Sequence, residues 1–340
     1  MNGIQEHKDL RPLNTFGVAA RARYFTEIAD ADGLSNLFRH DTFRNMPLLV
    51  LGGGSNILFK GDFNGLVIHC SVKGIRTETT GDSEVLVTAG AGESWHGLVT
   101  HCVESGLGGI ENLALIPGSC GAAPIQNIGA YGREVESVIE RVEGIHLMTG
   151  ETFRMSREEC HFGYRESIFK HDFEKKFFIS SVTLRLTHKN HVVNSGYEAL
   201  AAVLGPKQTE KPTIREVYDA VVEVRKKKLP DPAVTGNAGS FFKNPIITAA
   251  QLAMLREMHS SIPFYNVDNQ HVKVPAGWLI EQAGWKGKQE GHVGVHKHQA
   301  LVIVNHGNAT GSEILTFSQR IQTDVSEKFG ITLEREVNVV

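Results

Sequence analysis

The hydrophobic pattern of the first half of the chain predicts short strands separated by glycine turns. Residues 47–51 are mainly apolar and run directly into the glycines at 52–54, and residues 57–59 and 66–68 are two further apolar runs. A short helix is expected at 95–104. Further strands are expected at 85–87, 142–147 and 177–186. Because these elements mix without strict βαβ alternation, the pattern indicates an α+β fold.

Two amphipathic helices are expected in the second half, and each is opened by a capping box. Thr213 and Glu216 have the S/T-x-x-E spacing, and the helix after them ends in a lysine run before Pro230. Thr310 and Glu313 repeat that spacing ahead of a second apolar stripe. The pattern therefore predicts both where these helices start and which face is buried.

The chain is expected to end in a strand over residues 331–339, after Gly330 stops the second helix. Side chains alternate between the two faces of a strand, so Glu334, Glu336 and Asn338 would share its polar face.

Size and charge limit the classes of function. The 340 residues suggest two domains, or three, at roughly 150 residues per domain. The net charge of −3 gives no overall basic field, so binding to nucleic acid or to an anionic membrane surface is not expected. Any anionic ligand would have to be held by individually placed groups.

Cysteine spacing and hydropathy point to a cytoplasmic protein. The four cysteines form no C-x-x-C pair, so free thiols in a reducing compartment are expected. The sequence shows no apolar leader core and no run near 18 apolar residues, so membrane insertion is not expected. His292, His296 and His298 lack a zinc-binding pattern, and no metal is expected.

Two small-residue loops are candidates for holding a nucleotide. The loop after residues 47–51 could bring backbone N–H groups to phosphates, although Ile57 occupies the third glycine position of a dinucleotide fingerprint. The segment 113–132 is rich in Gly, Ala and Pro, which suits main chain that approaches a ligand closely. From spacing alone, a dinucleotide between the loops and a pair of tight structural turns stay equally open.

Nine motifs occur in order over residues 13–337 and cover essentially the whole chain. They are LNTFG at 13–17, LGGGSNIL at 51–58, ENLALIPG at 111–118, PIQNIGAYG at 124–132, FGYR at 162–165, KLPDP at 228–232, GNAGSFFKNP at 236–245, AGWLI at 276–280 and LEREV at 333–337. With these motifs the sequence resembles the UDP-N-acetylenolpyruvoylglucosamine reductase (UDP-N-acetylmuramate dehydrogenase) family.

The resemblance implies an FAD-binding domain of the vanillyl-alcohol-oxidase (PCMH) type in two α+β halves, followed by an α+β substrate-binding domain. The halves are expected at 1–70 and 71–205, and the substrate-binding domain at 206–325. A C-terminal strand, 326–340, would carry Glu336 to the active site.

The implied cofactors are FAD and NADPH. The implied reaction is the reduction of UDP-N-acetylglucosamine enolpyruvate to UDP-N-acetylmuramate in peptidoglycan precursor synthesis, by a protein expected to be a monomer. FAD would lie on main chain of the two small-residue loops. The residues expected to bind it are Gly52, Gly53, Gly54, Ser55, Asn56, Ile57, Pro117, Gly118, Gly121, Ala122, Gln126, Asn127, Gly129 and Ala130.

Three residues in the matching motifs would carry the chemistry. Arg165 would bind the substrate carboxylate in a bidentate manner and stabilise the enolate. Ser240, in a small-residue turn, would deliver the proton, and Glu336 would assist as a charged hydrogen-bond partner or as an acid.

The UDP-sugar would contact Lys228, Asn244 and Gln299, which match family positions. The sequence departs from the family pattern at two positions. Tyr197 stands at a shifted position relative to the substrate-binding tyrosine of many members, and Asn338 replaces a common arginine.

Without the resemblance, Arg165 would be read as a surface arginine, Ser240 as a turn serine, Glu336 as a solvated carboxylate and Lys228 as a helix-end charge. Two other functions stay open. One is a flavin oxidase acting on an alcohol or amine with oxygen, against which the Ser240 and Glu336 motifs argue. The other is a non-catalytic nucleotide-sugar sensor, which would not need a proton donor.

Overall fold

The computed structural model describes residues 3–30, 33–34, 37, 43, 46–171, 177–205 and 211–340. Its mixed helix and strand content confirms the predicted α+β class. The chain forms two compact units. The first unit comprises Met1–Lys8, Ala22–Gly54 and Asn64–Lys227, and the second comprises Asp9–Arg21, Ser55–Phe63 and Lys228–Val340. The four-part domain scheme stays a prediction, and residues 206–210 at one of its boundaries lie outside the described residues.

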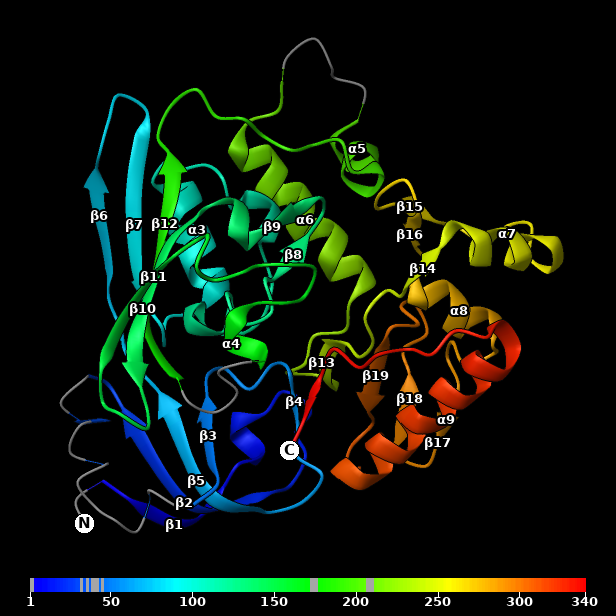
Figure 1. Ribbon diagram of the computed structural model, residues 1–340, viewed down its shortest axis with the longest axis horizontal. Helices are drawn as coiled ribbons and strands as arrows, with labels where there is room; N and C mark the ends of the chain where they lie inside the picture. The colour runs from blue at the N-terminus through cyan, green and yellow to red at the C-terminus, as the bar shows by residue number, and fades with distance from the viewer. Residues whose placement is uncertain are drawn as a thin grey trace. The chain divides into compact units, whose positions relative to one another are not determined.

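A five-stranded antiparallel sheet forms the framework of the first unit (Figure 1). Its strand order is β11-β10-β12-β7-β6. The strands are β6 (Ile75–Thr79), β7 (Glu84–Gly90), β10 (Ile139–His146), β11 (Thr152–Ser156) and β12 (Phe177–Thr187). The predicted strands at 85–87, 142–147 and 177–186 fall on β7, β10 and β12.

Two helices pack against this sheet and share its apolar core. They are α3 (Trp95–Glu104), which has the predicted bounds, and α6 (Ile214–Lys228). The shorter helices of this unit are α4 (Ile168–His171), α5 (Glu198–Leu204), and the 3-10 turns η2 (Glu111–Leu113), η3 (Cys120–Ala122) and η4 (Val135–Ser137). The small-residue segment at 113–132 is therefore packed on α3 and α6, and a two-residue ladder of β8 (Gly129–Ala130) and β9 (Arg133–Glu134) closes it.

A second, four-stranded sheet carries the first glycine loop. Its order is β1-β2-β5-β3, and β3 pairs in parallel with β5 so that Leu48 lies opposite Leu66. The strands are β1 (Gln5–Asp9), β2 (Arg21–Ile28), β3 (Leu48–Leu51) and β5 (Phe63–Cys70). The predicted apolar runs at 47–51 and 66–68 are thus neighbouring buried strands.

The second unit is built on the sheet β13-β19-β18-β17, against which α9 (Gly311–Phe329) packs (Figure 1). Its strands are β13 (Gly236–Ser240), β17 (Gln289–Glu290), β18 (Val293–Val295) and β19 (Val302–Asn305). The other elements are η1 (Arg11–Leu13), β4 (Ile57–Leu58), β14 (Ile246–Thr248), α7 (Ala249–Met258), β15 (Tyr265–Asn266), β16 (His271–Lys273), α8 (Ala276–Gln282) and β20 (Asn338–Val339).

Both predicted capping boxes are confirmed. The Thr310 hydroxyl accepts the Glu313 N–H at 3.2 Å while the Glu313 carboxylate accepts the Thr310 N–H at 2.7 Å. Thr213 and Glu216 make the same reciprocal pair at the start of α6. The stop after α9 is also confirmed, because Gly330 has a φ of 64°.

The predicted strand over 331–339 is wrong in extent. Only β20 forms a ladder, in parallel with β4, and Arg335 makes an isolated bridge to Phe242. The alternation still holds in burial, since Leu333 and Val337 are buried whereas Glu334 and Asn338 are exposed. The alternation of apolar residues arises because this segment packs on the core of the second unit. Alternation alone does not show that a neighbouring strand is available for pairing, so it overestimated the length of the strand.

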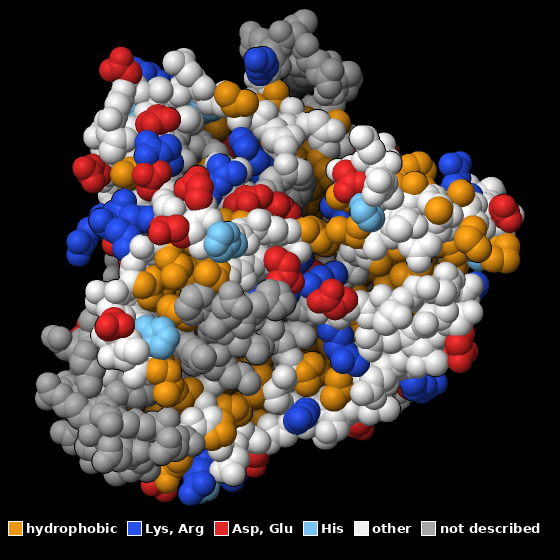
Figure 2. Space-filling model, in the orientation of Figure 1, with side chains coloured by type: hydrophobic (Ala, Val, Ile, Leu, Met, Phe, Trp, Pro, Cys, Tyr) orange, Lys and Arg blue, Asp and Glu red, His pale blue; other side chains and the backbone are white. Residues whose placement is uncertain are grey.

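The four cysteines are free and buried, as expected. Burial raises the pKa of the Cys102 and Cys160 thiols to about 12, so these side chains behave as packing groups. No helix in the described part of the chain is long and apolar enough to cross a membrane. On the face drawn in Figure 2, acidic and basic side chains are interspersed among the coloured residues, in agreement with the small net charge.

Candidate active site

The two small-residue loops meet in the first unit, although about sixty residues separate them in sequence. A Cβ added to Gly53 would lie 2.9 Å from the Cα atom of Gly118, and one added to Gly52 would lie 2.2 Å from the Ser119 hydroxyl oxygen. The clash at Gly53 is with backbone, so only glycine fits there, whereas at Gly52 the Ser119 hydroxyl would have to move. The glycine at 54 has a φ of 61°, which an L side chain adopts with strain. The loops therefore form one continuous stretch of main chain with few side chains.

Side chains from two helices hold the start of the second loop. The Trp95 indole N–H donates to the Leu113 carbonyl at 2.9 Å. Leu115, which has a left-handed φ of 57°, donates its N–H to His96 Nδ1 at 3.1 Å, and its carbonyl accepts from Arg225 Nε at 3.2 Å. Both backbone groups of a strained residue are thus fixed by neighbours on α3 and α6.

Burial near this loop lowers the pKa of both His96 and Arg225. Burial, and then the positive charges of Lys226 and Arg225, lower the pKa of His96, which suits an imidazole nitrogen that accepts a hydrogen bond. Burial also lowers the pKa of Arg225, while its hydrogen bond to the Tyr131 hydroxyl acts in the opposite direction. Among the residues that the structure describes, no carboxylate pairs with Arg225.

The rest of the second loop divides into packing and positioning residues. A Cβ on Gly121 would lie 2.5 Å from the Ala91 Cβ, so Gly121 is required by packing. Ala122 lies in η3, and the Cβ of Ala122 is within 4 Å of the Gly52 position. Pro117, Gln126, Asn127 and Ala130 lie on the same loop. Gly121 is therefore explained by packing, and cofactor binding by the other residues of the loop stays a prediction.

Arg165 occupies a tight turn of the first unit. The turn is closed by reciprocal backbone bonds between Gly163 and Glu166 at 3.0 and 3.1 Å, and Arg165 itself has a φ of 57°. Its guanidinium donates to the Gly129 carbonyl at 3.0 Å and lies 5.3 Å from the Tyr164 ring centroid. The guanidinium of Arg165 is thereby fixed beside β8, which is part of the second loop.

Ser240 and Glu336 come together in the second unit, although 96 positions separate them in the sequence. Ser240 ends β13, and the Glu336 N–H donates to the carbonyl of the next residue, Phe241, at 2.9 Å. The Asn56 side chain donates to the Glu336 carbonyl at 3.1 Å, and Asn56 accepts from Asn338 in turn. Residues 55–57 of the predicted loop thus belong to the second unit, where Asn56 bonds to the Glu336 segment and Ile57 starts β4.

Comparison with known proteins connects these features. A family model for the UDP-N-acetylenolpyruvoylglucosamine reductase C-terminal domain matches residues 231–340, and a model for an FAD binding domain matches residues 22–156. A UDP-N-acetylenolpyruvoylglucosamine reductase of Amoebophilus asiaticus is 46% identical over 337 residues, which cover 99% of each chain. The chain belongs to the UDP-N-acetylenolpyruvoylglucosamine reductase family. The predicted family and enzyme class are therefore confirmed.

Other members of the reductase family agree. The reductase of Flavobacterium johnsoniae is 45% identical over 99% of each chain. The crystal structure of the enzyme from Thermus caldophilus has the same fold, with a TM-score of 0.66, 24% identity and coverage of 98% and 97%. The FAD binding model supports the predicted flavin, and FAD and NADPH are the cofactor pair of the family.

The residues of the first unit suit FAD. Two loops of bare main chain meet at Gly53 and Gly118, where backbone N–H groups can approach a pyrophosphate closely. Beside the second loop, Arg225 supplies a half-buried positive charge that suits an anionic cofactor.

Two of the predicted substrate-binding residues of the reductase meet at the start of α8. The Asn244 side-chain oxygen accepts the Ala276 N–H at 2.9 Å, and a Cβ on Gly277 would lie 3.4 Å from the Gln299 Oε1 atom. Lys228 is exposed at the end of α6. Tyr197 belongs to the first unit, where it precedes α5 and packs edge-on against Tyr131 at 5.4 Å.

Sequence reasoning missed Arg225, Tyr131 and His96 of the reductase. Arg225 was read as part of a basic run, yet it follows the buried residues Val221 and Tyr218 by four and seven positions. Helical periodicity therefore separates it from the exposed lysines that follow. Nothing in the local pattern marks His96 or Tyr131.

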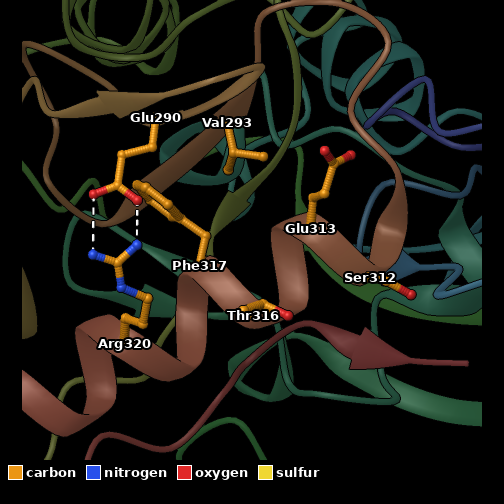
Figure 3. Close-up of a pocket in the computed structure, with 7 residues that line it drawn as sticks. All are labelled: Glu290, Val293, Ser312, Glu313, Thr316, Phe317 and Arg320. Carbon is orange, nitrogen blue, oxygen red and sulfur yellow. Dashed lines mark hydrogen bonds and ion pairs between the residues drawn. The ribbon is translucent and has the colours of Figure 1, made fainter.

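The second unit also has a hollow on its surface (Figure 3). It has a volume of about 330 Å³ and lies between α9 and the strands β17 and β18. Its charged side chains Arg320 and Glu290 bond to one another. None of the predicted site residues lines it. In the described residues no three His, Cys, Asp or Glu side chains gather as a metal site requires.

Proposed function

We propose that this protein reduces the enolpyruvyl group of UDP-N-acetylglucosamine enolpyruvate to the lactyl ether of UDP-N-acetylmuramate, with NADPH as the reductant. The proposal includes a role in peptidoglycan precursor synthesis, a cytoplasmic location and a monomeric state. It rests above all on the union of the Ser240 strand end with the Glu336 segment, in a chain of this reductase family.

The chemistry requires a hydride at the terminal vinyl carbon and a proton at the adjacent carbon. The main chain of the two loops would hold FAD, which would supply hydride transfer from NADPH to the substrate. Arg165 binds the substrate carboxylate and stabilises the enolate charge that develops on it. Ser240 donates its hydroxyl proton to the carbon that bears the carboxylate, and Glu336 holds the geometry or assists the proton transfer. The product keeps both added hydrogens, and NADPH leaves as NADP⁺.

The chain's other residues bind and orient. Asn244 and Gln299, which converge on the start of α8, would contact the UDP-sugar together with Lys228. Tyr197 would reach the substrate from the first unit. Gly53, Gly54 and Gly118, with the other predicted loop residues, would hold the cofactor by main chain.

Single-turnover flavin spectroscopy tests the proposal. The FAD-loaded protein is bleached with one equivalent of NADPH under anaerobic conditions, and the enolpyruvyl UDP-sugar is then added. We expect the oxidised flavin spectrum to return with formation of UDP-N-acetylmuramate. Reoxidation by oxygen alone, after reduction by an alcohol or amine, would indicate an oxidase. Binding of the UDP-sugar without any reduction by NADPH would indicate a sensor.

A further inference from the structure

Asn127 stands out among the buried polar residues of the first unit because every group of its side chain is engaged. It is fully buried and has a left-handed φ of 44°, which asparagine tolerates better than most residues. Its Nδ2 atom donates to the Gly163 carbonyl at 3.0 Å and to the Glu134 carboxylate at 3.2 Å. Its Oδ1 atom accepts the Glu136 N–H at 3.1 Å.

These partners fix the orientation of the amide. A backbone N–H can meet only the oxygen, and a carbonyl can meet only the nitrogen, so the two ends of the amide cannot be exchanged. The side chain therefore links three segments of the first unit in a single arrangement. Because the side chain is fully engaged, any contact of Asn127 with FAD would have to come from the main chain of Asn127.

One of those side-chain links and the backbone carbonyl of Asn127 both lead to Arg165. The Gly163 carbonyl that Asn127 holds belongs to the tight turn that carries Arg165. The guanidinium at the other end of Arg165 donates to the Gly129 carbonyl at 3.0 Å and lies 3.5 Å from the Asn127 carbonyl oxygen. Asn127 thus bonds through its side chain to the turn that carries Arg165, and its carbonyl oxygen contacts the guanidinium.

The backbone conformation of Arg165 makes such support necessary. A left-handed φ is unfavourable for arginine, and residues in that conformation persist where their surroundings determine them strongly. A Cβ on Gly129 would lie 3.2 Å from the Arg165 Nη1 atom and 2.8 Å from the Glu134 Cγ atom, so the guanidinium fits closely. A small movement of the turn would displace the guanidinium.

We infer that Asn127 is a positioning residue, which holds Arg165 in the orientation that receives the substrate carboxylate. This inference rests on the proposed function, because it assigns to Arg165 the carboxylate of the enolpyruvyl group. A displaced guanidinium would weaken stabilisation of the enolate and leave the reaction of NADPH with the flavin alone.

The test is a double-mutant cycle that combines substitutions of Asn127 and Arg165. Flavin reduction by NADPH and flavin reoxidation by the enolpyruvyl UDP-sugar are measured separately. Asn127→Asp keeps the size and the acceptor of the side chain but removes both N–H donors. We expect it to slow flavin reoxidation by the enolpyruvyl UDP-sugar about 10- to 100-fold, with flavin reduction by NADPH changed less than about threefold. In an Arg165→Ala background the same substitution should have almost no further effect on reoxidation.

Asn112→Asp is the matched control. Asn112 is equally buried and donates to the Tyr131 and Asn194 carbonyls at 3.2 and 2.7 Å, and none of its bonds involves the 163–166 turn. Its effect should be the same with and without Arg165. If the aspartate introduced at position 127 prevents FAD binding, Asn127→Gly replaces it in the double-mutant cycle with Arg165→Ala. Glycine adopts the left-handed backbone without strain.

The outcomes separate the two proposals. Additive effects of Asn127→Asp and Arg165→Ala, or equal slowing of both half-reactions, would overturn the positioning role and leave the proposed function standing. Failure of the wild-type flavin to be reoxidised by the enolpyruvyl UDP-sugar would instead overturn the proposed function.

Discussion

Arg225→Met removes the half-buried cation that bonds to the second loop and keeps most of the volume of the side chain. Two hydrogen bonds are lost, one to the Leu115 carbonyl at 3.2 Å and one to the Tyr131 hydroxyl. Hydrogen bonds from a charged donor contribute about 1.5–3 kcal/mol each. Removal of a partly desolvated charge offsets part of that loss. We therefore expect the free energy of unfolding to fall by about 2 kcal/mol.

The same substitution should weaken FAD binding. Leu115 has a left-handed φ of 57°, and without the Arg225 bond its backbone is held only by His96. Ordering one residue costs about 1–2 kcal/mol. If the bound cofactor must order Leu115 again, its Kd should rise about tenfold. Arg225→Lys should be intermediate, because an ammonium keeps the charge but cannot reproduce the planar donor geometry.

Urea unfolding of the FAD-free protein and titration of flavin fluorescence measure the two effects. Lys226→Met is the matched control, since it removes the next cation of the same helix from an exposed position. If the Arg225→Met and Lys226→Met proteins had the same free energy of unfolding and the same FAD affinity, the conclusion that Arg225 holds the second loop would be refuted.

Three further predictions concern the proposed proton donor Ser240, a histidine and a helix cap. Ser240→Ala should slow flavin reoxidation by the enolpyruvyl UDP-sugar about 10²-fold and leave reduction by NADPH nearly intact; equal loss in stopped-flow traces of both steps would contradict it. The pKa of His96 is lowered below its ordinary value of about 6.5, so the unfolded chain binds more protons just below that pH. Stability from His96 is therefore present above about pH 6.5 and declines as the pH falls toward the folded-state pKa. His96→Gln should reduce the difference in urea stability between about pH 7.5 and about pH 5.5, and an unchanged difference would argue against it. Thr310→Ala should cost about 1 kcal/mol in thermal unfolding, whereas Thr323→Ala, inside the same helix, should cost less.

Local signals explain which elements could be predicted from the sequence. The capping boxes at Thr213 and Thr310 depend on residues three positions apart, and the structure forms both. The helix at 95–104 begins after Ser94, whose hydroxyl accepts the Gly97 N–H at 3.3 Å. In each case the side chains that define the element are neighbours in the chain, so no tertiary information was needed.

The features that escaped prediction depend on distant partners. The segment 331–339 has strand-like alternation, yet only Asn338–Val339 finds a ladder partner. Helix α5 ends just before the expected domain boundary at residues 205 and 206, and Leu200 is its one fully buried residue. The order of the five-stranded sheet brings β7 beside β12, which the local pattern does not encode.

Three residues of the first unit with left-handed backbones share one physical arrangement. Leu115, Asn127 and Arg165 have φ values of 57°, 44° and 57°, and each would be destabilising in isolation by about 1 kcal/mol or more. Leu115 is held by bonds from α3 and α6, and Asn127 by its own amide, which also fixes the turn of Arg165. Because these polar groups are buried and paired, their loss would leave unsatisfied partners as well as a relaxed backbone. The strained conformations are therefore built into the protein fold itself, and a ligand that requires them would meet them already formed.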